Sequence, residues 1–195
     1  RIDLQEKIKS ELNEHLEVIQ TLHSDAKWIP VLHRIALECI KSLRGGGKVL
    51  LCGNGGSAAD AQHIAAELSG RYLLDRDPLD VEALHVNTSY LTAVANDYDF
   101  SEVYSRAILA KGREGDVLIG LSTSGKSPNI LKAFATARKQ EMVTVAFTGI
   151  RENELQNQAD FCLKAPSAHT PRIQEIHILF GHMLCLMIED AMFRI

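Results

Sequence analysis

The chain lacks an excess of positive charge. Its 195 residues include 21 Lys and Arg against 25 Asp and Glu, which gives a formal net charge of -4 at pH 7. Proteins that bind DNA, RNA or anionic membrane surfaces usually gather Lys and Arg into clusters that neutralise phosphate groups. The charge balance therefore predicts no nucleic-acid partner and no membrane partner.

Long apolar runs and paired cysteines are missing as well. No unbroken apolar run in the sequence reaches the about 20 residues that a membrane-spanning helix needs. The four cysteines are scattered and include no C-x-x-C pair: Cys39, Cys52, Cys162 and Cys185. This spacing is unlike that of a dense disulfide framework, and it indicates a reduced, cytoplasmic protein.

The residues that are present have the balance of a globular domain. Hydrophobic residues make up 46% of the chain and charged residues 24%, which excludes a disordered or fibrous protein. The length suits one α/β domain better than two small ones, and no stretch has the composition of an interdomain linker. We therefore expect one domain over residues 1–195.

Two helices are expected before any strand. Apolar residues recur every three or four positions near the start of the chain: Leu4, Ile8, Leu12, Leu16 and Ile19. This period predicts an amphipathic helix over about the first two dozen residues. A second helical pattern follows Pro30 and ends at the glycines 45–47. Because these leading helices (1–45) have no strand beside them in sequence, they must cover the later sheet or pack against another subunit.

After residue 47, expected strands and helices alternate. Strong strand patterns cover 48–52, 116–121 and 142–147, and weaker ones cover 81–86 and 161–164. Helical patterns lie between or after them, at 58–68, 91–94, 103–109, 128–139 and 173–192. This alternation predicts a single doubly wound parallel sheet flanked by helices on both faces.

Two loops of unusual composition follow expected strands. Residues 52–57 read CGNGGS, and residues 122–127 read STSGKS. Neither has the Walker spacing, and the first departs from the G-x-G-x-x-G dinucleotide motif. Since ligands of parallel sheets bind at the carboxyl ends of strands, both loops are candidates for a binding site.

The second loop has the chemistry of a phosphate site. Three consecutive hydroxyl residues and Ser127 surround Gly125, next to the free backbone N–H groups of a helix start. Such a loop suits a phosphate monoester without a metal or an arginine. The alternative is that Ser127 simply caps the helix ahead of Pro128. The number of hydroxyls favours anion binding.

A further group of polar residues lies on two expected helices. His63 and Glu67 are four residues apart and share one helix face. Gln174 and His182, eight residues apart on the last helix, are separated by only about 80° around its axis. Two imidazoles, a carboxylate and an amide could form acid/base machinery or a metal site. A lone His or Glu on a helix is more often simply solvated, as we assume for His177, and the sequence alone does not bring the two helices together.

Five motifs in this order resemble the phosphoheptose isomerases of the sugar isomerase (SIS) superfamily. The resemblance covers essentially the whole chain. Its motifs are the loop 52–57 with Asp60-Ala61-x-His63-x-x-x-Glu67-Leu68 and Gly70-Arg71-Tyr72, then Asn96-Asp97, the stretch 112–118, Ser122-Thr123-Ser124-Gly125 and the stretch 172–177.

The resemblance implies an SIS-like fold and an aldose–ketose isomerase. The implied reaction converts sedoheptulose 7-phosphate to D-glycero-D-manno-heptose 7-phosphate through an enediol, in ADP-heptose and lipopolysaccharide core biosynthesis. It implies Glu67 and His182 as the acid/base pair. It further implies phosphate contacts from Ser122, Thr123, Ser124 and Ser127, and sugar contacts from Asn54, Gly55, Gly56, Ser57, Glu67, Asn96, Asp97 and Gln174.

The resemblance also implies a cofactor and an assembly. Family members can carry zinc, and the matching ligands here are His63, Glu67, Gln174 and His182. The family is typically homotetrameric, with active sites between subunits. Two departures flank the implied site: Ala58-Ala59 stands where some members have His-Cys, and Pro171 where some have Asp. They put fine substrate contacts in doubt, but not the acid/base pair.

Two other functions within the superfamily are compatible with parts of the sequence. Non-catalytic adaptors that bind the DnaA replication initiator share a similar glycine-rich loop, Ala-Ala included, and a similar R-I-Q-E stretch. They lack counterparts of Glu67 and His182, both of which are present here. A sugar-phosphate-sensing module of a regulator would need a DNA-binding region, which these residues do not include. The sequence therefore favours the enzyme.

Overall fold

Five parallel strands form one sheet at the centre of the structure. The computed structural model describes residues 3–194. The strands are β1 (Val49–Gly53), β2 (Val81–Ala83), β3 (Val117–Leu121), β4 (Val143–Thr148) and β5 (Phe161–Lys164). Their order is β2-β1-β3-β4-β5, and every neighbouring pair is parallel. The expected α/β class, all five expected strands and the doubly wound arrangement are confirmed.

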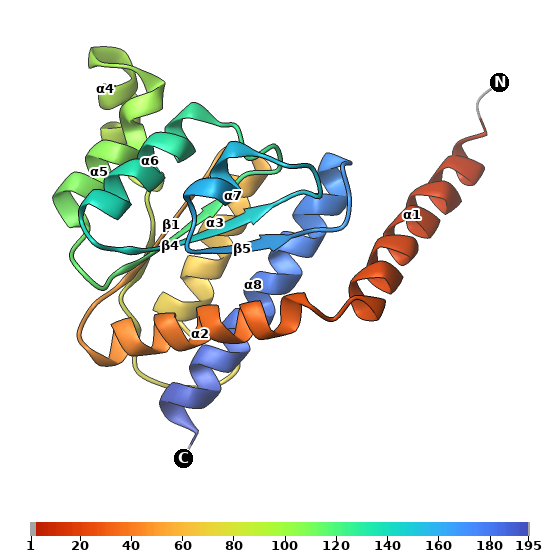
Figure 1. Cartoon of the computed structure of the whole chain (residues 1–195), viewed down its shortest axis with the longest axis horizontal. Coiled ribbons are helices and arrows are strands. Elements are labelled where there is room, and N and C mark those ends of the chain that lie inside the picture. Colours follow the sequence, from red (N-terminus) through yellow and green to blue (C-terminus); the bar gives the residue numbers. More distant parts are fainter. Residues whose placement is uncertain (1–2, 195) are drawn as a thin grey trace.

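Helices cover both faces of the sheet (Figure 1). Side chains of successive strand residues point to opposite faces, so Val49 and Leu51 enter one core and Leu50 and Cys52 the other. The first core is closed by α2 (Trp28–Arg44), α3 (Gly56–Ser69) and α8 (Thr170–Phe193). The second core is closed by α4 (Thr88–Asp97), α5 (Val103–Lys111), α6 (Pro128–Lys139) and α7 (Glu154–Gln158).

The two leading helices have different surroundings. In α2, Leu32, Ile35 and Cys39 are buried in the first core, so this helix covers the sheet. In contrast, α1 (Leu4–Ser24) extends away from the rest of the molecule (Figure 1). Its apolar residues at positions 4, 8, 12 and 16 are 54% to 70% exposed. Most of the apolar stripe of α1 is therefore left without a partner among residues 3–194.

Ion pairs fix the inner part of α1 to the start of α8. Arg172 contacts Glu11 at 2.9 Å and Glu175 at 2.6 Å. His15 contacts Glu175 at 2.6 Å, and His169 lies 3.1 Å from Glu14. The direction of α1 is thus set by side-chain contacts rather than by burial of its apolar stripe.

α8 is a core helix, although its composition allows another interpretation. Its length and hydropathy alone would allow it to cross a membrane. The sequence predicted no such helix, because it contains no unbroken apolar run of the required length. Its apolar side chains instead lie in the first core, where Ile176, Phe180 and Leu184 are fully buried.

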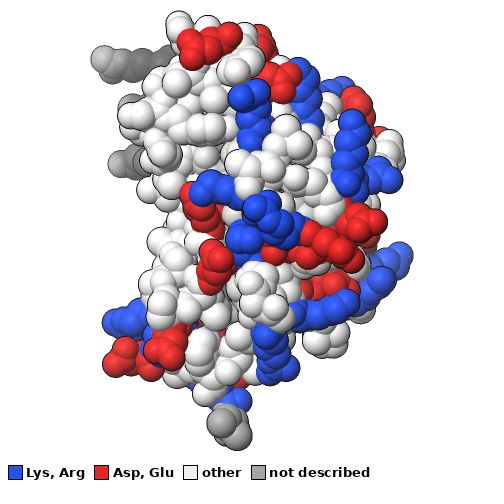
Figure 2. Space-filling model, turned by 90° about the vertical axis from the view of Figure 1, so that its left-hand side faces the viewer, with Lys and Arg blue, Asp and Glu red and all other residues white. Residues whose placement is uncertain are grey.

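On the face drawn in Figure 2, Lys and Arg side chains are interspersed with Asp and Glu.

Short elements and helix starts differ from expectation. The second helix begins at Trp28, ahead of Pro30, because a proline in the first turn lacks only an N–H that would have no partner there. α4 is longer than expected because the side chain of Asn87 caps it, accepting a hydrogen bond from Tyr90 N at 3.0 Å. The 3-10 helix η1 (Phe100–Glu102) and α7 are too short to produce a periodic pattern.

Candidate active site

The two loops of unusual composition meet at one edge of the sheet. β1 and β3 are neighbours, with Gly53 opposite Leu121, so the loops that follow them lie side by side. The strand order reverses between these two strands, because β2 extends the sheet on one side and β4 on the other. A crevice forms at such a switch point, outside the carboxyl ends of the strands. The expected placement of both loops is confirmed.

A pair of amides joins the two loops. Asn54 Nδ2 donates to Asn129 Oδ1 at 2.9 Å, and Asn129 Nδ2 donates to Asn54 Oδ1 at 2.8 Å. Asn129 is buried in the first turn of α6, directly after the hydroxyl loop. Sequence analysis missed Asn129, because an Asn near a helix start is common and only the fold brings it opposite Asn54.

The hydroxyl loop 122–127 curls around its own polar atoms. Ser122 Oγ accepts a hydrogen bond from Gly125 N at 3.1 Å and lies 3.2 Å from Ser127 Oγ. Ser127 occupies the N-cap position of α6, yet its side chain makes no capping hydrogen bond. The alternative that Ser127 serves only as a cap is therefore wrong in this geometry, and the hydroxyls remain available to an anion.

Gly125 is required by this loop. Its φ is +64°, in the region that side-chain-bearing residues rarely adopt, and a Cβ there would lie 2.2 Å from the side chain of Asn153. Asn153 in turn caps α7, accepting from Gln156 N at 2.9 Å. The loop is thus packed directly against the segment after β4.

A cavity of about 230 Å³ opens beside the hydroxyl loop. Its polar lining consists of Thr123, Ser124, Lys126, Arg151, Glu152, Ser167 and Thr170, and the Glu152 carboxylate is paired with Lys164 at 2.8 Å. Hydroxyl groups and two cationic side chains are suitable partners for a phosphate group. Lys126 and Arg151 were not predicted as site residues, since the hydroxyls alone carried the sequence argument.

Close packing of α3 on α8 brings the polar helix residues together. Gly181 has no side chain, and a Cβ there would lie 2.5 Å from Ile64. Gly56 likewise allows the Gln174 side chain to approach, since a Cβ at Gly56 would lie 2.6 Å from Gln174 Nε2. The Gly56–Gln174 contact comes before the Ile64–Gly181 contact on both helices, so α3 and α8 run parallel to each other.

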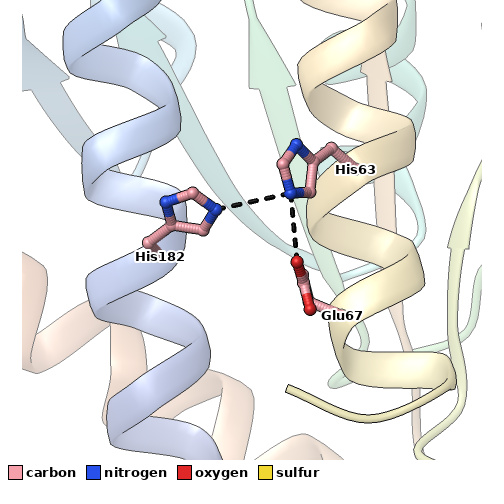
Figure 3. A group of neighbouring side chains, drawn as sticks. All are labelled: His63, Glu67 and His182. Atoms are coloured by element: carbon pink, nitrogen blue, oxygen red, sulfur yellow. Dashed lines mark hydrogen bonds and ion pairs between the residues drawn. The ribbon is translucent and has the colours of Figure 1, made fainter. Parts of the chain in front are cut away.

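His63, Glu67 and His182 form one cluster between α3 and α8 (Figure 3). His63 Nε2 lies 3.0 Å from Glu67 Oε1 and 3.4 Å from His182 Nε2. One ligand atom from each residue lies within 4.8 Å of the other two. The side chains of His63 and Glu67 are 48% and 25% exposed, so a substrate can reach them.

The remaining predicted residues occupy the surroundings. The Gln174 amide lies against Gly56, near the starts of α3 and α8. Asn96 and Asp97 are exposed at the end of α4, where the amide donates to its neighbour's carboxylate at 3.0 Å. Ser57 is buried in the first turn of α3. Within residues 3–194, Glu67 and His182 do not line the cavity beside the hydroxyl loop.

Asp60 is an acidic residue that sequence analysis did not single out. It lies one turn before His63 on α3, and its Oδ2 atom is buried without a hydrogen-bond partner among the described residues. Burial raises the pKa of Asp60 to about 6, although nearby His63 acts in the opposite direction. A carboxyl group that titrates near neutrality is typical of functional sites.

Known proteins are similar to this chain over most of its length. Residues 12–149 match the SIS domain family. A phosphoheptose isomerase of Rhodospirillum rubrum is 52% identical over 163 residues, which are 84% of this chain and 87% of that protein. A solved phosphoheptose isomerase structure from Neisseria gonorrhoeae has a TM-score of 0.90 and 39% identity, covering 96% of this chain and 100% of that one. One from Francisella tularensis has a TM-score of 0.92 and 35% identity, covering 97% and 100%.

These matches agree with the resemblance found in the sequence. They give no support to the alternative of a DnaA-binding adaptor, because the relatives that match over most of the chain are named as isomerases. The chain belongs to the SIS domain family and, within it, to the phosphoheptose isomerases.

Proposed function

We propose that the chain converts sedoheptulose 7-phosphate to D-glycero-D-manno-heptose 7-phosphate, in the biosynthesis of ADP-heptose for lipopolysaccharide core. One observation carries the mechanism: Glu67 and His182, from two different helices, converge on His63. This cluster supplies proton transfer, and the hydroxyl loop supplies phosphate binding.

The phosphate of the substrate would bind at the hydroxyl loop. Ser122, Thr123, Ser124 and Ser127 offer O–H donors just before the N-terminus of α6, whose dipole favours an anion. Lys126 and Arg151 line the cavity beside this loop and balance the charge of the phosphate. Anchoring the substrate far from the reacting carbons gives binding energy that orients them for reaction.

The acid/base pair accounts for isomerisation. Glu67 removes a proton from C1 of the ketose while His182 protonates the oxygen on C2, which gives the enediol. His182 then takes the proton from the oxygen on C1 while Glu67 delivers its proton to C2, which gives the aldose. A partly buried carboxylate and an imidazole are suited to these transfers near neutral pH.

We propose that zinc is held by His63, Glu67, Gln174 and His182. Two imidazole nitrogens and a carboxylate oxygen within 4.8 Å of one another form a donor set that zinc prefers. Gln174 is included because the resemblance to the family implies it as the fourth ligand. When bound, zinc would polarise the substrate carbonyl. Protein purified without chelator should contain about one zinc ion per chain, and chelation should lower its activity. Full activity in zinc-free protein would contradict this proposal.

We infer that the enzyme is a cytoplasmic homotetramer. The exposed apolar stripe of α1 supports association with further copies, since such a stripe is costly to leave in water. The four cysteines are unpaired, and three of them are buried, which is compatible with a reducing compartment.

The proposed function is tested by assaying the purified protein with sedoheptulose 7-phosphate and with other ketose phosphates. We expect turnover of sedoheptulose 7-phosphate above all others, with Glu67→Gln inactive but still protected against thermal unfolding by the substrate. Equal turnover of shorter ketose phosphates would contradict the substrate assignment. Full activity of Glu67→Gln would contradict the assignment of the base.

A further inference from the structure

The motif Gly70-Arg71-Tyr72 has no role in the mechanism above, yet it lies beside the acid/base cluster. It begins the segment 70–77, which follows α3. The Tyr72 ring stacks on the imidazole of His182, with ring centroids 6.0 Å apart and an angle of 18° between the planes. His63 packs edge-on against His182, with centroids 5.1 Å apart. The imidazole of His182 is therefore held between two rings.

The backbone of Tyr72 is anchored by a buried carboxylate. Glu189 on α8 is fully buried. Its two oxygens accept hydrogen bonds from the backbone N–H groups of Tyr72 at 3.0 Å, Leu73 at 2.8 Å and Leu74 at 2.8 Å. Three consecutive backbone donors on one carboxylate leave the segment little freedom to move.

Arg76 joins the same anchor to the end of α3. Its Nε atom donates to Glu189 at 3.0 Å, and both side chains are at most 3% exposed. Its guanidinium also donates to the backbone carbonyls of Glu67 at 2.9 Å and Leu68 at 2.8 Å. Arg76 thus connects the turn that carries the proposed base to the segment that carries Tyr72.

The anchor and the acid/base histidine share one helix face. Glu189 follows His182 by seven residues, or nearly two full turns of α8. Burial raises the pKa of Glu189, but the three backbone N–H groups and Arg76 outweigh burial and hold it below its ordinary value. The carboxylate is therefore charged at neutral pH, and α8 fixes both His182 and the ring that covers it.

We propose that Tyr72 is a positioning residue for His182, and that Glu189 and Arg76 hold Tyr72 in place. Stacking restricts the orientation of the imidazole, so that its nitrogen faces the substrate oxygens throughout the reaction. The inference rests on the proposed isomerase function. It means that the Gly70-Arg71-Tyr72 motif helps to orient the acid/base pair. It also means that the buried Arg76–Glu189 pair positions Tyr72 in addition to stabilising the fold.

The kinetic test compares Tyr72→Leu, which removes the ring, with Tyr72→Phe, which keeps it. We expect Tyr72→Leu to lower kcat about two- to tenfold with KM little changed, and Tyr72→Phe to restore the wild-type kcat. Phe161→Leu is the matched control, because Phe161 is another partly buried ring against the same core and lies on β5, away from the cluster. Circular dichroism and thermal melting check that each variant folds.

A second measurement does not depend on turnover. In protein with labelled histidines, the imidazole signals of His182 should shift in Tyr72→Leu, because a stacked ring displaces the resonances of its neighbour, and should stay in place in Phe161→Leu. Wild-type kcat in Tyr72→Leu, an equal loss in Tyr72→Phe, or an unshifted His182 signal would overturn the proposal. An inactive wild type whose His182 signal still responds to Tyr72→Leu would refute the isomerase function but leave the stacking contact in place.

Discussion

Two polar residues, Asn129 and His177, have structural roles that the sequence did not predict. Asn129 fixes the amide of Asn54 across the crevice, and His177 lies fully buried beneath the end of β4. His177 Nε2 is 3.0 Å from the carbonyl oxygen of Thr148, so this nitrogen carries the proton and donates. We assumed a solvated His177, and the structure corrects that assumption: the residue belongs to the core.

Replacing Asn129 should weaken substrate binding. Asn129→Ala removes both hydrogen bonds to Asn54, which leaves an amide of the proposed sugar-binding loop without its partner. We expect KM for sedoheptulose 7-phosphate to rise about tenfold, the effect of losing about 1–2 kcal/mol of hydrogen bonding. Asn157→Ala, at an exposed position of α7, is the control and should leave KM unchanged. An unchanged KM in Asn129→Ala would exclude a positioning role for Asn129.

The buried His177 should make stability depend on pH. Burial lowers its pKa from 6.5 to about 4, although the hydrogen bond to Thr148 acts in the opposite direction. Below pH 6.5 the unfolded chain therefore binds a proton that the folded protein excludes, and stability falls as the pH drops from 6.5 to 4, by about 3 kcal/mol in all. Urea unfolding at several pH values should show this loss, and His177→Gln should abolish it. A loss of the same size in His177→Gln would assign it to other groups.

At the scale of helices and strands, local patterns predict most of the fold. Strand positions follow from short apolar runs buried on both faces, as in 116–121, and helix α6 follows from its Pro128 start and apolar period. The packing of α3 on α8 could not be predicted, because it depends on where Gly56 and Gly181 leave room for side chains of the other helix. For the same reason the sequence predicted that His63 and Glu67 share a helix face, but only the fold brings His182 beside them.

The Arg76–Glu189 pair could not be predicted either, since the two residues lie 113 positions apart. Removing one charge leaves the other buried without its partner, so Glu189→Gln should lower the free energy of unfolding by about 3 kcal/mol and Tm by about 10 °C. Because the pKa of Glu189 is lowered in the folded state, this stabilisation is present at neutral pH, and it is lost progressively as the pH falls below the ordinary value of 4.5 and through the lowered folded-state pKa. The exposed Glu17→Gln on α1 is the control for thermal melting. Equal melting temperatures for the two variants would contradict the structural role of the pair.

At the scale of the whole molecule, contacts among the described residues of one chain do not explain why the apolar stripe of α1 is exposed. Its amphipathic period was predictable, but its direction away from the body was not, because that depends on ion pairs to Arg172 and Glu175 at the start of α8. Leu12→Glu together with Ile8→Glu places charges within the exposed apolar stripe. Light scattering should show the wild type as a tetramer and the double variant as a smaller species. A stable monomeric wild type would contradict the proposed assembly.

The account as a whole depends on proton transfer by Glu67 and His182 at one end of a substrate held by its phosphate at the other. The most direct test follows the reaction in D₂O by NMR. An enediol mechanism predicts deuterium at C2 of D-glycero-D-manno-heptose 7-phosphate, because the proton on Glu67 exchanges with solvent between its removal from C1 and its delivery to C2. It also predicts that Glu67→Gln binds the substrate but incorporates no deuterium. Isomerisation or deuterium incorporation that persists in Glu67→Gln would contradict the mechanism.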